Sequence, residues 1–160
     1  MTTPLVIILM GSSADLEHCK KIAEACRQFE LETELRIGSA HKTAEHTMAI
    51  LRHYEEDPRP KVYITVAGRS NALSGFTDGF VNGPVIACPP FSEAFGGADV
   101  FSSLRMPSGV APALVLEPIN AALLAAKFFG QFIPKIKENV INFQKAQADK
   151  IIAADHQSQL

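Results

Sequence analysis

The segment Leu5–Met10 is a continuous apolar run with a glycine directly after it, and it limits the folds open to this chain. A run without polar alternation predicts a strand that is buried on both faces, as in a parallel sheet. The next segment predicts an amphipathic helix, because apolar residues recur at three- and four-residue spacing: Leu16, Cys19, Ile22, Ala23, Cys26 and Phe29. A buried strand followed by such a helix is typical of α/β proteins.

The same alternation continues along the chain. Further strands are predicted over residues 34–37, 62–67, 84–88 and 113–116, and further helices over residues 44–55 and 118–129. Pro118 is well placed as the first residue of its helix, and Gly130 as the residue that ends it. Strands alternating with helices predict an α/β fold of three layers, with a parallel sheet covered by helices on both faces.

Residues 131–160 have a different pattern. One stripe of a further helix is marked by Ile133, Ile136, Val140, Phe143 and Ile151. We therefore expect a single α/β domain over residues 1–130 and an amphipathic helical extension and tail over residues 131–160. The stripe fits packing on the chain's own core and packing on a neighbouring subunit equally well.

Composition excludes several classes of protein. The chain has 160 residues, enough for one domain, and its formal net charge of −2 does not favour a nucleic-acid partner. No apolar stretch reaches 18 residues and no basic segment precedes the first strand, so we expect no membrane span and no signal peptide. Three cysteines without a CxxC pair predict neither a disulfide framework nor a zinc site, which favours the cytoplasm. Cys88, at the end of a strand, is either a small buried residue or part of a site.

Polar loops follow the first three predicted strands. Gly11–Asp15 opens a helix, where backbone N–H groups favour an anion, and Asp15 could accept hydrogen bonds from ribose hydroxyls. Helix capping by Ser12, Ser13 or Asp15 is the alternative. The loop contains neither GxGxxG nor a Walker A motif, so neither a dinucleotide nor ATP is indicated.

The loop Gly38–Lys42 carries the clearest chemistry. Lys42 can neutralise a phosphate, and a histidine such as His41 can move a proton near neutral pH. The alternative is that His41 is simply solvated, as we expect of His18, His46 and His53 at polar helix positions.

The loop Gly68–Asn71 offers hydrogen-bond donors, or else a turn capped by Ser70 or Asn71. Residues 91–109 predict a long ordered loop of the kind that often covers a site. Right-handed crossovers would bring the loops at residues 11–15, 38–42 and 68–71 to one edge of the sheet.

Four motifs in this order resemble one family: Gly11-Ser12-x-x-Asp15, Ser39-Ala40-His41-Lys42, Ala67-Gly68-Arg69-Ser70-Asn71 and Ser103-Leu104-Arg105-Met106-Pro107-Ser108-Gly109. The chain is similar, over residues 4–130, to the aminoimidazole ribonucleotide (AIR) carboxylase and N5-carboxyaminoimidazole ribonucleotide mutase family of purine biosynthesis. The resemblance implies a flavodoxin-like fold, no cofactor, no metal, and a homo-oligomer such as a tetramer or octamer.

The family has two classes, and this chain resembles the second. Class I members move a carboxylate from nitrogen to carbon and typically carry Ser-Ala-His-Arg and a loop with a second histidine. Here Lys42 replaces that arginine, and residues 68–73 contain no histidine. The resemblance therefore implies class II activity, in which AIR is carboxylated at C4 by CO2 without biotin or ATP, with the mutase as the alternative. A non-catalytic nucleotide-binding module is a remote third possibility.

The resemblance also implies roles for individual residues. His41 would be the catalytic base that removes the C4 proton. The ribose and phosphate would be held by Ser12, Asp15, Ser39 and Lys42. The base and CO2 would be received by Gly68, Arg69 and Ser70, which would make residues 1–130 the catalytic domain.

Overall fold

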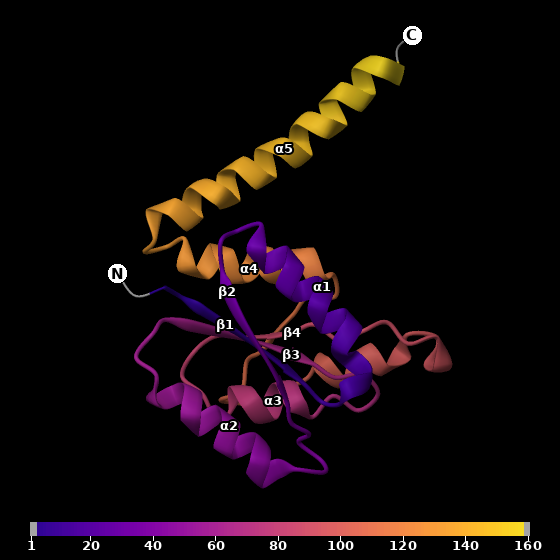
Figure 1. The fold of residues 1–160 in the computed structure, drawn as a ribbon. Helices are drawn as coiled ribbons and strands as arrows, with labels where there is room; N and C mark the ends of the chain where they lie inside the picture. Colours follow the sequence, from indigo (N-terminus) through magenta and orange to yellow (C-terminus); the bar gives the residue numbers. More distant parts are fainter. Residues whose placement is uncertain (1–2, 159–160) are drawn as a thin grey trace.

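The computed structural model describes residues 3–158 and contains one parallel sheet between two layers of helices (Figure 1). The strands are β1 (Leu5–Met10), β2 (Glu32–Ile37), β3 (Lys61–Val66), β4 (Val85–Ala87) and β5 (Ala113–Leu114), in the spatial order β2-β1-β3-β4-β5. All four neighbouring pairs are parallel. The predicted α/β fold with a flavodoxin-like three-layer sheet is thus confirmed, and the strand ends differ from the predicted ones by at most two residues.

The apolar run of β1 serves both faces of the sheet. Val6, Ile8 and Met10 belong to a core shared with α1 (Leu16–Arg27) and α4 (Pro118–Phe129). The alternate residues Leu5, Ile7 and Leu9 belong to a second core, to which α2 (Ala44–Glu56) and α3 (Leu73–Asp78) contribute. Because successive side chains of a strand point to opposite faces, a run that is apolar at every position can build both cores.

Residues 91–109 form an ordered segment with two short 3-10 helices, η2 (Glu93–Phe95) and η3 (Ala98–Ser103). The sequence predicts an ordered loop here but neither 3-10 helix, and it does not predict α3. A third 3-10 helix, η1 (Ser13–Asp15), precedes α1.

The C-terminal helix α5 (Pro134–Ser158) begins on the domain and then leaves it (Figure 1). Ile136 and Val140 are buried in the core beside α1 and α4, and the Phe143 ring meets the Phe29 ring edge-on at 5.1 Å. Ile151, on the same predicted stripe, is 72% exposed. The proximal part of the stripe therefore packs on the chain's own core, and the distal part does not.

Candidate functional site

The site lies where the strand order reverses. The chain passes from β1 to β2 on one side and then to β3 on the other, so the loops after β1 and β3 diverge and leave a crevice at the carboxyl ends of the strands. A cleft of about 690 Å³ opens at this edge. Its lining includes every residue that the sequence nominates: Ser12, Asp15, Ser39, His41, Lys42, Gly68, Arg69 and Ser70.

The first loop is organised by local hydrogen bonds. Ser12 caps η1, because its hydroxyl oxygen accepts a hydrogen bond from the Ala14 N–H at 3.3 Å. Burial raises the pKa of the Asp15 carboxyl, while His18, the Ser12 hydroxyl and Arg69 act to lower it. Asp15 is thus a partly desolvated carboxyl near the His18 ring and the Arg69 guanidinium, and it can accept hydrogen bonds from a hydroxylated ligand.

The second loop is held close to α2. Gly38 is buried, and a Cβ at this position would lie 2.7 Å from Oγ1 of Thr47, so only glycine allows this approach. The Lys42 N–H donates to the Ser39 hydroxyl oxygen at 3.2 Å, and the Ser39 N–H donates to Oγ1 of Thr43 at 2.9 Å. These bonds form a tight turn that leaves the exposed side chains of His41 and Lys42 on the cleft.

The third loop contains Gly68, Arg69, Ser70 and Asn71, and it leads into α3. Arg69 has φ of 59°, in the left-handed region, and its N–H donates to Oδ2 of Asp99 at 2.9 Å. Asn71 is buried, and its Oδ1 accepts a hydrogen bond from the Ser74 N–H at 3.2 Å, in the first turn of α3. The N-cap position of α3 is Ala72, so Asn71 holds the helix start from the preceding position, and Arg69 and Ser70 stay exposed on the cleft.

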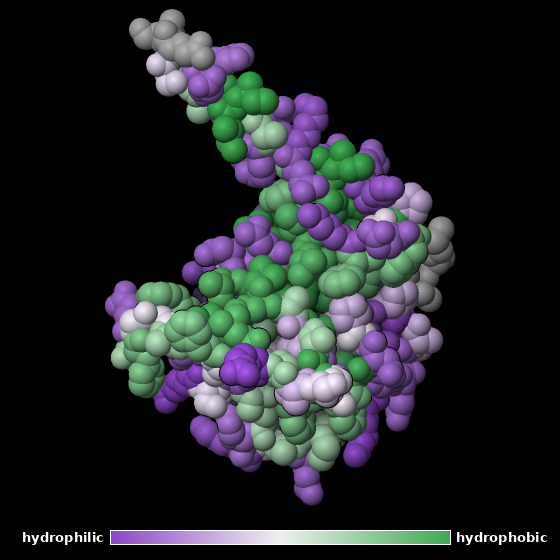
Figure 2. Space-filling model, turned by 180° about the vertical axis from the view of Figure 1, so that it is seen from behind, coloured by the Kyte–Doolittle hydropathy of each residue, from purple (hydrophilic) through white to green (hydrophobic). Residues whose placement is uncertain are grey.

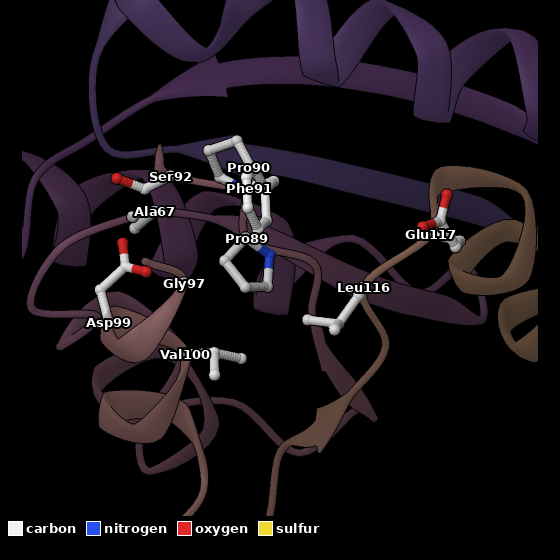
Figure 3. A pocket seen from close by; sticks show the side chains of 11 residues that line it. Ala67, Pro89, Pro90, Phe91, Ser92, Gly97, Asp99, Val100, Leu116 and Glu117 are labelled. Atoms are coloured by element: carbon white, nitrogen blue, oxygen red, sulfur yellow. The ribbon is translucent and has the colours of Figure 1, made fainter. Parts of the chain in front are cut away.

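A smaller and mainly apolar cavity of about 200 Å³ adjoins the cleft (Figure 3). The two hollows share Ala67, Gly68, Pro90, Phe91, Ser92 and Asp99 in their linings. Pro89, Val100 and Leu116 line the smaller one alone (Figure 3). A small uncharged molecule would lose little solvation in such a cavity.

His18 departs from its expected environment. The sequence predicts a solvated side chain, but the ring is half-buried and its Nε2 lies 3.1 Å from the carbonyl oxygen of Cys88. The expectation was wrong because it considered only the pattern within α1, whereas the end of β4 packs on this turn. Cys88 itself is fully buried, and its thiol lies 3.6 Å from the carbonyl oxygen of Leu116. His46 and His53 are exposed, as expected.

Sequence reasoning missed Asp99 and the residues Pro90, Phe91 and Ser92, although they line the cleft. The sequence predicts a long loop that covers a site, and its motif Ser103–Gly109 lies outside the lining of the cleft. Within residues 3–158 no group of three or more His, Cys, Asp or Glu side chains could hold a metal ion. None of the helices described there is long and apolar enough to cross a membrane.

The fold and the cleft together define an α/β protein that binds a small ligand at the switch point of its sheet. The family model described as AIR carboxylase matches residues 5–150. A phosphoribosylaminoimidazole carboxylase of Treponema denticola is 60% identical over 95% of this chain and 96% of its own length. One from Archaeoglobus fulgidus is 51% identical over 94% of this chain and 83% of its own length.

A human bifunctional phosphoribosylaminoimidazole carboxylase/phosphoribosylaminoimidazole succinocarboxamide synthetase is 44% identical over 92% of this chain and 36% of its own length. The crystal structure of Treponema denticola PurE is 60% identical, superposes with a TM-score of 0.94, and is matched over 96% of this chain and 98% of that one. This chain belongs to the AIR carboxylase family.

Proposed function

We propose that this protein carboxylates AIR at C4 with CO2 to give 4-carboxy-5-aminoimidazole ribonucleotide in purine biosynthesis. The observation that carries the proposal is the meeting of the eight nominated residues, from three loops, in one cleft of about 690 Å³. Relatives named phosphoribosylaminoimidazole carboxylase and spanning nearly the whole chain support the same activity.

The phosphate and ribose bind at the first two loops. Lys42 supplies a fixed positive charge on the cleft, and Ser12 and Ser39 supply hydroxyls that can donate to phosphate oxygens. Asp15 accepts hydrogen bonds from the ribose. Gly68, Arg69 and Ser70 receive the base, which orients C4 toward the apolar cavity that takes CO2.

The chemistry needs one new bond and one proton transfer. The C4 carbon of AIR behaves as an enamine carbon, so its electron pair forms the C–C bond to CO2 while one C=O π pair moves onto oxygen. The ring is then cationic and still carries the C4 proton, which His41 removes to restore aromaticity. Decarboxylation runs the same steps in reverse. CO2 is already electrophilic, so the step proceeds without biotin, ATP or metal, and positioning of the two partners supplies a large part of the rate.

The change His41→Asn tests the base. The variant keeps a polar side chain of smaller size but cannot take the proton, so we expect AIR binding to persist and carboxylation to fall by about 10²–10⁴-fold. The measurements are calorimetric titration with AIR and turnover under CO2. His46→Asn is the matched control, because His46 is an exposed histidine on α2 that does not line the cleft. Near-normal turnover by His41→Asn would remove His41 from the role of base.

A second assay separates direct carboxylation from the mutase. The protein is given AIR with CO2 and, separately, freshly prepared N5-carboxyaminoimidazole ribonucleotide. We expect product only from the first pair. Productive use of the second substrate alone would replace carboxylation by the mutase activity, and AIR binding without any reaction would indicate a non-catalytic module.

We further propose that the protein works in the cytoplasm as a homo-oligomer, a tetramer or octamer. In this arrangement residues 1–130 are the catalytic domain and residues 131–160 an extension. The three buried, unpaired cysteines are compatible with a reducing compartment.

A further inference from the structure

Side chains of the 3-10 helix η3 form hydrogen bonds to the backbone of the third cleft loop, residues 68–71. Oδ2 of Asp99 accepts the hydrogen bond from the Arg69 N–H at 2.9 Å, across 30 positions in the chain. The Ser102 hydroxyl oxygen accepts a hydrogen bond from the Asn71 N–H at 3.0 Å, and its single proton lies between the carbonyl oxygens of Asp99, at 2.8 Å, and Arg69, at 3.1 Å. The N–H groups of Arg69 and Asn71 are therefore both held by side chains of η3.

The backbone conformation of Arg69 explains why these hydrogen bonds are needed. Its φ of 59° lies in the left-handed region, which is unfavourable for residues with a Cβ. A residue persists there only when its surroundings hold it. The neighbouring bond from Nδ2 of Asn71 to the Ser103 hydroxyl, at 2.8 Å, fixes the end of the same loop from the same helix.

The loop of residues 68–71 forms part of the wall between the cleft and the apolar cavity. Gly68 and Asp99 line both the cleft and the apolar cavity, and Figure 3 shows the Asp99 side chain beside Ala67, on the same side of the cavity as Ser92. Lys42, which we assign to the phosphate, comes from a different loop and lines only the cleft. A shift of Arg69 would therefore change the wall near the base and CO2 more than the phosphate end.

We propose that Asp99 is a positioning residue for the reaction, which holds the backbone of Arg69 so that Gly68–Ser70 keep the shape that brings AIR and CO2 together. Ser102 holds the N–H of Asn71, two positions further along the same loop. The proposal rests on the proposed function, since it assigns Asp99 to the carboxylation site. It goes further by naming a residue that acts through the backbone of its neighbour Arg69.

Two substitutions at Asp99 separate the hydrogen bond from the charge. Asp99→Asn keeps an oxygen that can accept from the Arg69 N–H but removes the negative charge. Asp99→Ala removes both. We expect Asp99→Ala to lower kcat/KM for CO2 by roughly 10–100-fold, because a small misplacement of reacting partners has effects of this size. AIR affinity should change far less, and Asp99→Asn should recover most of the activity.

Asp78→Ala is the matched control. Oδ2 of Asp78 also accepts a hydrogen bond from a distant backbone N–H, that of Ala111, at 2.6 Å, across 33 positions in the chain. Asp78 does not line either hollow. Its loss should lower the melting temperature without changing KM for CO2. Ser102→Ala is the second test variant, should Asp99→Ala fail to fold, and it should lower kcat/KM for CO2 in the same way.

A structural readout is independent of turnover. The amide proton of Arg69 is hydrogen-bonded, so its exchange with deuterium, followed in a peptide spanning residues 68–72, should be slow in the wild type and in Asp99→Asn. It should be fast in Asp99→Ala. Exchange is compared with and without AIR, which tests whether this hydrogen bond exists before the substrate arrives.

The outcomes divide cleanly. Wild-type kinetics in Asp99→Ala would overturn the role of Asp99, and so would an equal loss in Asp99→Asn, which would point to the charge instead. If Asp78→Ala loses kcat/KM for CO2 to the same extent, the loss in Asp99→Ala is explained by general destabilisation, and the proposal is overturned. If the wild-type protein leaves AIR unchanged under CO2, the proposed function itself is overturned. If the wild type is active and Asp99→Ala is equally active, only the role of Asp99 is overturned.

Discussion

At the scale of single residues, His18 shows how a contact distant in sequence changes a side chain's chemistry. Burial lowers the pKa of the His18 ring, and the hydrogen bond to the carbonyl oxygen of Cys88 opposes this effect. The folded protein therefore takes up this proton less readily than the unfolded chain. Neutral His18 therefore stabilises the folded state. This contribution to the free energy of unfolding is present above the ordinary histidine pKa, about 6.5, and is lost as the pH falls through the lowered pKa of the folded protein.

The change His18→Gln tests this. Glutamine can donate to the Cys88 carbonyl oxygen but does not titrate, so the variant should lose less of its free energy of unfolding than the wild type when the pH falls from about 7.5 to about 5.5. The measurement is urea unfolding at the two pH values. His53→Gln, at an exposed histidine of α2, is the control for the exchange of a histidine for glutamine. An unchanged pH dependence in His18→Gln would contradict the assignment.

At the scale of elements, α5 divides into a part that packs and a part that projects. Phe143 is half-buried and meets the Phe29 ring at 5.1 Å, whereas Ile151 lies two turns further along and is 72% exposed. We expect Phe143→Ala to lower the free energy of unfolding by about 1–3 kcal/mol, less than for a fully buried phenylalanine. Ile151→Ala should change it by less than about 0.5 kcal/mol.

Urea unfolding followed by circular dichroism measures both variants. Equal effects of the two substitutions would contradict the division of the helix. The division itself could not be read from the sequence, because the apolar stripe continues to Ile151 although the surface that it packs on ends earlier.

The sequence predicted those elements whose pattern is local. The continuous run of β1 and the three- and four-residue spacing of α1 each follow from burial on known faces, so their positions were found. Helix α3 was missed because Leu73–Asp78 is too short to show a period and contains Gly75.

The candidate site divides in the same way. Ser12, His41 and Lys42 lie in loops that directly follow strands, so topology alone brings them to one edge. Asp99 is one of two acidic residues in a long loop, and its partner Arg69 is 30 positions away. Nothing local in the sequence marks such a pair, since only the packing of η3 on the cleft loop creates it.

At the scale of the whole molecule, much large apolar surface remains exposed. Phe91, Phe95, Phe101 and Leu104 lie in the segment between β4 and β5, and further exposed side chains lie in and before α5: Phe132, Ile141, Ile151 and Ile152. Figure 2 shows one face of the molecule, on which a broad apolar area runs from a lobe at the left of the view, across the centre, toward the base of α5. An area of this kind is unusual for a monomer and is typical of an interface.

Light scattering coupled to gel filtration tests the proposed assembly. We expect the wild type to elute with the mass of four or eight copies of the 17.3-kDa chain, because copies of the same chain can cover these apolar side chains mutually. Replacing the exposed Phe101 and Leu104 by aspartate should shift the mass toward smaller species, since buried charges oppose association. Gln144→Asp, an exposed polar position of α5, is the control and should leave the mass unchanged. A wild type with the mass of one chain across all concentrations would contradict the assembly.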